Sequence, residues 1–188
     1  MRKPPDGPAD KSQELCDQRP RRSDAQLRDG ALLAAPGARR QEPEQQRRRY
    51  ATIAAGWLHD TIEDADTSHK ALVGEFGEEI ADLVLEVSNV SRPIHGKRPM
   101  RKRLDLQYLA GASWRAQMIK CADMIDNVPS IVEHDINFAM VYVPEKKALL
   151  DRLTLAHRVC FPIWMDAYKV VADGEQAIAE HLSNASAA

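Results

Sequence analysis

The chain has 188 residues, of which 44% are hydrophobic and only 5% aromatic, and its formal net charge at pH 7 is −2. This length suits one domain with its own core, and the charge gives no electrostatic reason to expect a nucleic acid as partner. No apolar run is long enough to cross a membrane, and no signal-peptide pattern begins the chain. Cys16, Cys121 and Cys160 form no close pair, so we expect a soluble protein of the reducing cytoplasm.

Residues 1–45 differ in composition from the rest of the chain. They contain six prolines and many Arg and Gln residues, and their one apolar run covers only residues 31–35. Low hydrophobicity with scattered proline is typical of disordered or loosely structured segments. We therefore predict two parts, a poorly structured or divergent N-terminal segment over 1–45 and a helical domain over 46–188.

The remainder of the chain shows helical periodicity and no convincing strand alternation. A first helix is predicted from about residue 44 to residue 62, with Ile53, Trp57 and Leu58 facing the core. Pro129 is expected to bend or break a later helix, because proline lacks the backbone N–H. The further helices are predicted at about 69–76, 78–90, 100–110, 114–133, 143–159 and 162–182. The predicted fold class is all-α.

The first predicted helix ends in a cluster of ionisable residues, His59, Asp60, Glu63 and Asp64. On one continuous helix, spacings of three and four would place them on a single wall. Three carboxylates beside an imidazole repel one another unless protons or a cation neutralise them, and a bound divalent metal is the simplest explanation.

A second apolar stretch, predicted to be helical, carries Asp123 and Asn127 four residues apart. An Asp inside an apolar helix is costly to bury without a partner. A structural salt bridge or a capping role is the alternative for Asp123.

The pattern His59-Asp60-x-x-Glu63-Asp64, followed by Lys120-x-Ala122-Asp123-x-x-x-Asn127, resembles the HD superfamily of metal-dependent phosphohydrolases. Within it, the chain is most similar to the RelA/SpoT-type branch that hydrolyses (p)ppGpp, over roughly residues 50–160. The resemblance implies an HD-domain helical bundle in which His59, Asp60 and Asp123 bind a metal, usually Mn²⁺. It further implies that Glu63 and Asp64 position and activate the attacking water, and that Asn127 lies near the metal and the ribose. The implied reaction removes the 3′-pyrophosphate from a small guanine nucleotide, (p)ppGpp.

Basic residues cluster at 97–103, and phosphate groups need cationic partners. In the resembling family a basic segment at this place faces the site. We therefore expect Arg101 and Lys102 to contact phosphates, with a solvated basic face as the alternative.

The family also places a His ligand upstream of its His-Asp pair, whereas this chain has no His before His59. Either the N-terminal helices differ or another residue fills the position, and three ligands hold a metal more weakly than four. Two alternatives to an active alarmone hydrolase therefore stand. One is a catalytically weak or inactive HD domain that binds a nucleotide or a protein, and the other is an HD phosphohydrolase for another nucleotide. The sequence leaves the oligomeric state open.

Overall fold

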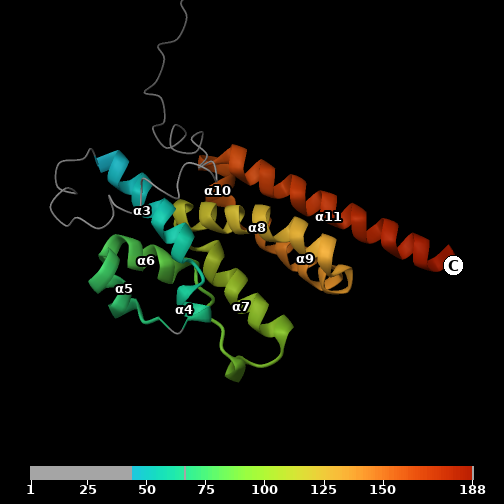
Figure 1. Cartoon of the computed structure of the whole chain (residues 1–188), viewed down its shortest axis with the longest axis horizontal. Helices are drawn as coiled ribbons and strands as arrows, with labels where there is room; N and C mark the ends of the chain where they lie inside the picture. The colour runs from blue at the N-terminus through green and yellow to red at the C-terminus, as the bar shows by residue number, and fades with distance from the viewer. Residues whose placement is uncertain (1–43, 66, 188) are drawn as a thin grey trace, which may run out of the picture.

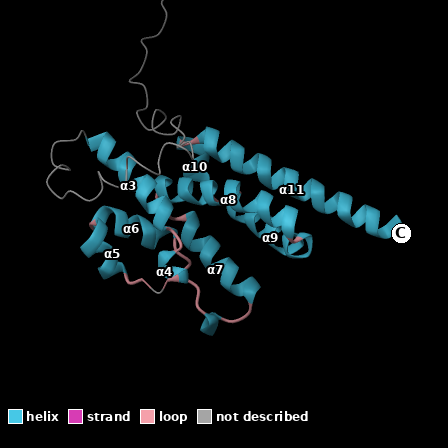
Figure 2. Ribbon diagram, in the orientation of Figure 1, coloured by secondary structure: helices cyan, strands magenta, loops and turns pink. Residues whose placement is uncertain are grey.

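The computed structural model describes residues 44–65 and 67–187, and the other residues are drawn in grey in Figure 1. The described residues form helices joined by loops and contain no strand, which confirms the all-α prediction (Figure 2). The segment predicted over 1–45 lies outside the described residues, except that Glu44 and Gln45 already belong to the first helix. No helix in the described part of the chain is both long and apolar enough to span a membrane.

The helices follow one another along the chain with short connections. Their bounds are α3 (Glu44–Leu58), α4 (Thr61–Asp64), α5 (His69–Phe76), α6 (Glu78–Val87), the 3-10 helix η2 (Pro93–His95), α7 (Arg98–Ala110), α8 (Trp114–His134), α9 (Ile136–Leu150), α10 (Thr154–Val159) and α11 (Phe161–Ala187). In Figure 1, α11 runs along α8 and α9, whereas α3, α5 and α6 pack together at the other end of α8.

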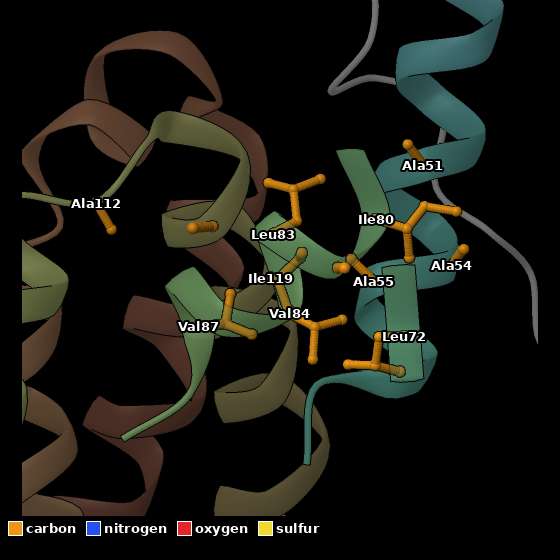
Figure 3. Packing of buried hydrophobic residues seen from close by; sticks show 12 residues of the cluster. Ala51, Ala54, Ala55, Leu72, Ile80, Leu83, Val84, Val87, Ala112 and Ile119 are labelled. Carbon is orange, nitrogen blue, oxygen red and sulfur yellow. The ribbon is translucent and has the colours of Figure 1, made fainter. Parts of the chain in front are cut away.

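A first hydrophobic core joins α3, α5, α6 and the beginning of α8 (Figure 3). Small side chains on α3, namely Ala51, Ala54 and Ala55, are buried and let this helix approach α6 closely. The prediction that Trp57 faces the core is wrong, because 65% of its surface is exposed. The buried stripe of α3 runs along the alanines, and Trp57 lies to one side of it.

A second core surrounds the later part of α8, which packs against α9, α10 and α11. Cys121, Met124 and Val128 of α8 are fully buried there. Because α8 contributes to both cores, Asp123 is carried by the helix that holds the two halves of the molecule together.

Three predicted helix boundaries are corrected by the structure. α8 continues through Pro129 to His134, because an exposed proline costs the helix one hydrogen bond without forcing it to end. The single helix predicted over 143–159 is two, α9 and α10, and α9 begins earlier because Asp135 caps it, accepting a hydrogen bond from the backbone N–H of Phe138. The first helix ends at Leu58 rather than at residue 62.

Candidate functional site

His59 and Asp60 lie in a turn between α3 and the single-turn helix α4. The backbone carbonyl of Asp60 accepts hydrogen bonds from the N–H groups of Glu63 and Asp64, which begins α4 at a new angle. The prediction of one continuous helix wall for these residues is therefore wrong. The turn nevertheless brings His59 and Asp60 to α8, where Asp123 lies.

The His59 imidazole is fixed by its backbone and directed at two carboxylates. Its Nδ1 donates a hydrogen bond of 2.7 Å to the carbonyl of Gly56, which leaves Nε2 as the free ring nitrogen. Nε2 lies 2.9 Å from Asp60 Oδ2 and 3.5 Å from Asp123 Oδ1. Nε2 is buried, and neither contact is a hydrogen bond, so this nitrogen has no hydrogen-bond partner among the described residues. An imidazole oriented in this way by a carbonyl is typical of metal-binding histidines.

Asp123 is surrounded by donors. Asn127 Nδ2 donates to its Oδ1 at 2.5 Å, and the ammonium of Lys146 from α9 lies 3.1 Å from its Oδ2. Lys120, one turn earlier on α8, is only 5% exposed, and its ammonium makes no hydrogen bond or ion pair with the described residues. The Asp123 carboxylate is thus the centre of the charged cluster.

The neighbours of each group shift its protonation in a consistent direction. The Asp123 carboxylate raises the pKa of His59, helped by the Gly56 carbonyl and Asp60, although burial acts the other way. Burial alone would raise the pKa of Asp123, but His59, Lys146 and Lys120 hold it well below its usual range. Partial burial raises the pKa of Asp60, and burial lowers the pKa of Lys120. The cluster therefore favours a positive charge at His59 Nε2, supplied by a proton or by a metal.

The donor atoms suit a divalent ion, but they are not arranged as a finished metal site. Within 44–65 and 67–187, no three His, Cys, Asp or Glu side chains form a group that could hold a metal as it stands. The Lys146 ammonium also lies against one oxygen of Asp123. An unpartnered buried imidazole nitrogen facing two carboxylates is nevertheless a ligand set that Mn²⁺ and related ions accept.

Glu63 and Asp64 lie on α4, with their side chains exposed. Glu63 accepts two hydrogen bonds from Asn89, one at 2.7 Å from its backbone N–H and one at 2.5 Å from its side-chain amide. The Asp64 side chain forms no hydrogen bond or ion pair with the described residues. The two carboxylates therefore differ, since Asn89 holds Glu63 by hydrogen bonds and Asp64 has no such contact with the described residues.

A cavity of about 410 Å³ lies beside this cluster, between α7, α8 and α9. Its cationic lining consists of Lys102, Arg103, Lys120 and Lys146, and Asn89 and Tyr142 also border it. Its two carboxylates already have partners. Asp105 accepts from Ser91, and Glu145 accepts two hydrogen bonds from Arg98. Glu145 is thus neutralised by Arg98, and Lys146 is paired with Asp123, whereas Ser91 is neutral and leaves Asp105 its charge. Lys102, Arg103 and Lys120 outnumber this carboxylate, so the remaining charge of the lining is positive, which suits an anionic ligand.

The two predicted phosphate contacts lie in different surroundings. Lys102 lines the cavity, whereas Arg101 does not. Arg101 is half-buried, and its Nε has no hydrogen-bond partner within the described residues.

Three residues of the site were missed or underrated from the sequence. Asn89 and Lys146 belong to no motif, and their contacts with Glu63 and Asp123 cross 26 and 23 residues. Arg103 was part of the basic cluster but was not singled out. The helix predicted over 78–90 included Asn89, whereas α6 ends at Val87, so the sequence carried no signal for the role of Asn89.

Comparison with curated proteins relates the chain to hydrolases of a guanine nucleotide. The guanosine-3′,5′-bis(diphosphate) 3′-pyrophosphohydrolase of Drosophila melanogaster is 37% identical over 76 residues, which cover 40% of this chain and 41% of the relative. The protein of the same name from Aquifex aeolicus is 28% identical over 116 residues, covering 58% of this chain and 16% of the relative. A protein of Arabidopsis thaliana named "Probable GTP diphosphokinase, chloroplastic" is 36% identical over 84 residues, 42% of this chain and 12% of the relative.

The chain therefore spans less than half the length of each of these relatives. The predicted resemblance to (p)ppGpp pyrophosphohydrolases is confirmed over that part. No protein-family model and no solved structure matches the chain.

Proposed function

We propose that the chain is a metal-dependent phosphohydrolase that removes the 3′-pyrophosphate of guanosine 3′,5′-bis(diphosphate) and releases GDP. The observation that carries the proposal is the buried Nε2 of His59. It faces two carboxylates beside a cation-lined cavity, in a chain related to proteins named for this reaction.

The proposed metal ligands are His59, Asp60 and Asp123, with Mn²⁺ as the proposed ion. When bound there, such an ion supplies Lewis acidity, polarising a phosphoryl oxygen and making a bound water more acidic. The protein's own part is to orient the donors. The Gly56 carbonyl fixes the His59 ring, and Asn127 fixes one oxygen of Asp123.

Glu63 is proposed to accept the proton of the attacking water, with Asp64 on the same turn of helix helping to orient that water. The water oxygen bonds to the phosphorus attached to the ribose 3′ oxygen, and the bond between that phosphorus and the 3′ oxygen breaks. The 3′ oxygen takes up a proton, returned by the protonated Glu63, so that pyrophosphate and a free 3′ hydroxyl result and Glu63 is ionised again. Hydrogen bonds restrict the Glu63 carboxylate to few orientations. A base that is already oriented reacts more readily, which favours this role for Glu63.

The phosphates are proposed to bind in the cation-lined cavity. Its volume of about 410 Å³ is within the range of small-molecule sites. Lys102, Arg103 and the buried Lys120 provide charge for the phosphates, and Arg101 is proposed as a further contact at the edge. Buried ammonium groups without carboxylate partners have the most to gain from a bound anion, since their desolvation is then compensated.

The test is hydrolysis by the purified full-length chain with Mn²⁺, comparing guanosine 3′,5′-bis(diphosphate) with guanosine monophosphate. We expect GDP and pyrophosphate in equal amounts from the first nucleotide and no phosphate from the second. Glu63→Gln should bind Mn²⁺ normally and lose turnover, whereas Asp60→Ala should lose the metal. Hydrolysis of the monophosphate alone would point to another nucleotide substrate, and equal metal content in the wild type and Asp60→Ala would refute the ligand assignment.

A further inference from the structure

Asn89 holds Glu63 through a two-pronged contact. Its backbone N–H donates to Glu63 Oε1 at 2.7 Å, and its side-chain Nδ2 donates to Glu63 Oε2 at 2.5 Å. Both oxygens of the carboxylate are therefore fixed by one residue. Charge-assisted hydrogen bonds in a paired arrangement set orientation as well as distance.

The end of α6 makes this contact available. The helix ends at Val87, and Ser88 is extended, so the N–H of Asn89 lies outside the helical hydrogen-bond ladder and faces α4. An asparagine at this place adds a second donor beside the first. An aspartate there would keep the backbone donor, but its side chain would offer none and would place a charge against Glu63.

The segment that carries Asn89 is anchored on its other side in the same way. The backbone N–H and the hydroxyl of Ser91 donate to the two oxygens of Asp105, at 2.8 and 2.9 Å. Asp105 is 4% exposed and belongs to α7, so it is a rigid anchor. Residues 89–91 therefore join the short helix α4 to α7 across the border of the cavity, which both Asn89 and Asp105 line.

We infer that Asn89 is a positioning residue that holds Glu63 at the edge of the cation-lined cavity, with Ser91 and Asp105 fixing the segment from behind. The inference rests on the proposed function, because it takes Glu63 as the base of that reaction. α4 has only four residues and buries none of them. Its Ile62 packs against the first core while only partly buried, but Glu63 itself is exposed, so the contact with Asn89 is what fixes the Glu63 carboxylate.

The chain offers a matched control of the same chemistry away from the site. Ser113 donates through its N–H and hydroxyl to the two oxygens of Glu86, at 2.8 and 2.6 Å. Ser113 precedes Asp123 by ten residues along α8, a distance of about 15 Å on a helix. Ser113→Ala removes one of the two hydrogen bonds to Glu86, as Asn89→Ala removes one of the two to Glu63, and its side chain contacts no residue of the candidate site. It also removes the N-cap hydrogen bond that the Ser113 hydroxyl accepts from the N–H of Ala116, so it controls for a general loss of stability as well.

The kinetic test uses the full chain with guanosine 3′,5′-bis(diphosphate) and Mn²⁺. Asn89→Ala should lower kcat roughly tenfold with KM changed less than about twofold, and Asn89→Asp should lower kcat roughly a hundredfold. Ser113→Ala should keep kcat. The shorter side chain of Glu63→Asp no longer reaches the two donors of Asn89. In that background Asn89→Ala should lower kcat less than about twofold, since the two residues act as one unit. Full additivity in that cycle, or a raised KM with unchanged kcat, would overturn the inference.

A second measurement does not depend on turnover. Hydrogen exchange of the Asn89 amide should speed up at least about tenfold in Glu63→Ala and stay unchanged in Ser113→Ala. Unchanged exchange in Glu63→Ala would show that the contact is absent and would overturn the inference. If wild-type protein hydrolyses the nucleotide and Asn89→Ala keeps kcat, the positioning role fails and the proposed function stands. If exchange reveals the contact but wild type has no activity, the proposed function fails, and the positioning role fails with it.

Discussion

Replacement of Lys146 by methionine is expected to lower the free energy of unfolding of the metal-free protein and to raise its affinity for Mn²⁺. The Lys146 ammonium lies 3.1 Å from Asp123 Oδ2, and the two side chains are only 17% and 7% exposed. Methionine preserves the length of the side chain and its packing near the Tyr142 ring, 4.8 Å from Lys146 Nζ, but it has no charge. The variant therefore leaves Asp123 buried with one cationic partner fewer.

The size of the effect follows from the same contact. Two unit charges 3.1 Å apart attract each other by about 5 kcal/mol at an effective dielectric constant of roughly 20. Much of this is offset by the hydration that both groups lose on burial, and His59 and Lys120 remain near Asp123. We expect a net loss of about 2–3 kcal/mol in the free energy of unfolding without metal. Since a metal no longer has to displace the ammonium, its dissociation constant should fall at least about tenfold, or ~1.4 kcal/mol.

Free Mn²⁺ is measured by electron paramagnetic resonance during a titration, and stability by urea unfolding with and without Mn²⁺. Lys147→Met is the matched control, because Lys147 is the next residue and pairs with Glu175 on the surface. That variant should leave the Mn²⁺ affinity unchanged. Equal affinities in wild type and Lys146→Met would refute the reasoning that Lys146 competes with the metal for Asp123.

Two further predictions concern the core. Gln117 is fully buried, and its Oε1 accepts hydrogen bonds from the N–H groups of Leu155 and Ala156. Gln117→Leu leaves both buried donors without an acceptor, so the free energy of unfolding measured in urea should fall by about 3 kcal/mol. A loss below ~1 kcal/mol would contradict this prediction. Burial raises the pKa of the Cys121 thiol from 9.0 to about 12, so above pH 9 the thiol ionises in the unfolded chain before it does in the folded one. The Cys121 thiol should therefore leave the free energy of unfolding unchanged below pH 8 and lower it by roughly 2 kcal/mol near pH 10.5. In Cys121→Ala this decrease should be absent. An identical pH dependence of stability in wild type and Cys121→Ala would contradict the role given to the thiol.

Helical periodicity predicted most of the fold, because the buried faces repeat at helical spacing. Ile80, Leu83, Val84 and Val87 of α6 are all in the core, as that spacing requires. Spacing alone failed at His59, because a period of three or four residues does not say whether the helix continues. The structure breaks α3 there and begins α4 two residues later.

The candidate site was predictable where its residues belong to a sequence motif. His59, Asp60 and the distant Asp123 were grouped through a motif, and the structure does bring them together. Asn89 and Lys146 could not be predicted, because an asparagine in a loop and a lysine in a helix acquire their roles only when α6 and α9 pack beside the site. Lys146 pairs with one oxygen of Asp123, a contact that no motif indicated.

Pyrophosphate release from guanosine 3′,5′-bis(diphosphate), measured with wild type and Glu63→Gln loaded with equal Mn²⁺, tests the central claim most directly. Glutamine keeps the size of the side chain but cannot take a proton from water at neutral pH. We predict multiple turnovers in the wild type, one GDP for each pyrophosphate, and a loss of at least about a hundredfold in kcat in the variant. No release by metal-loaded wild type, or equal release by both proteins, would contradict the account.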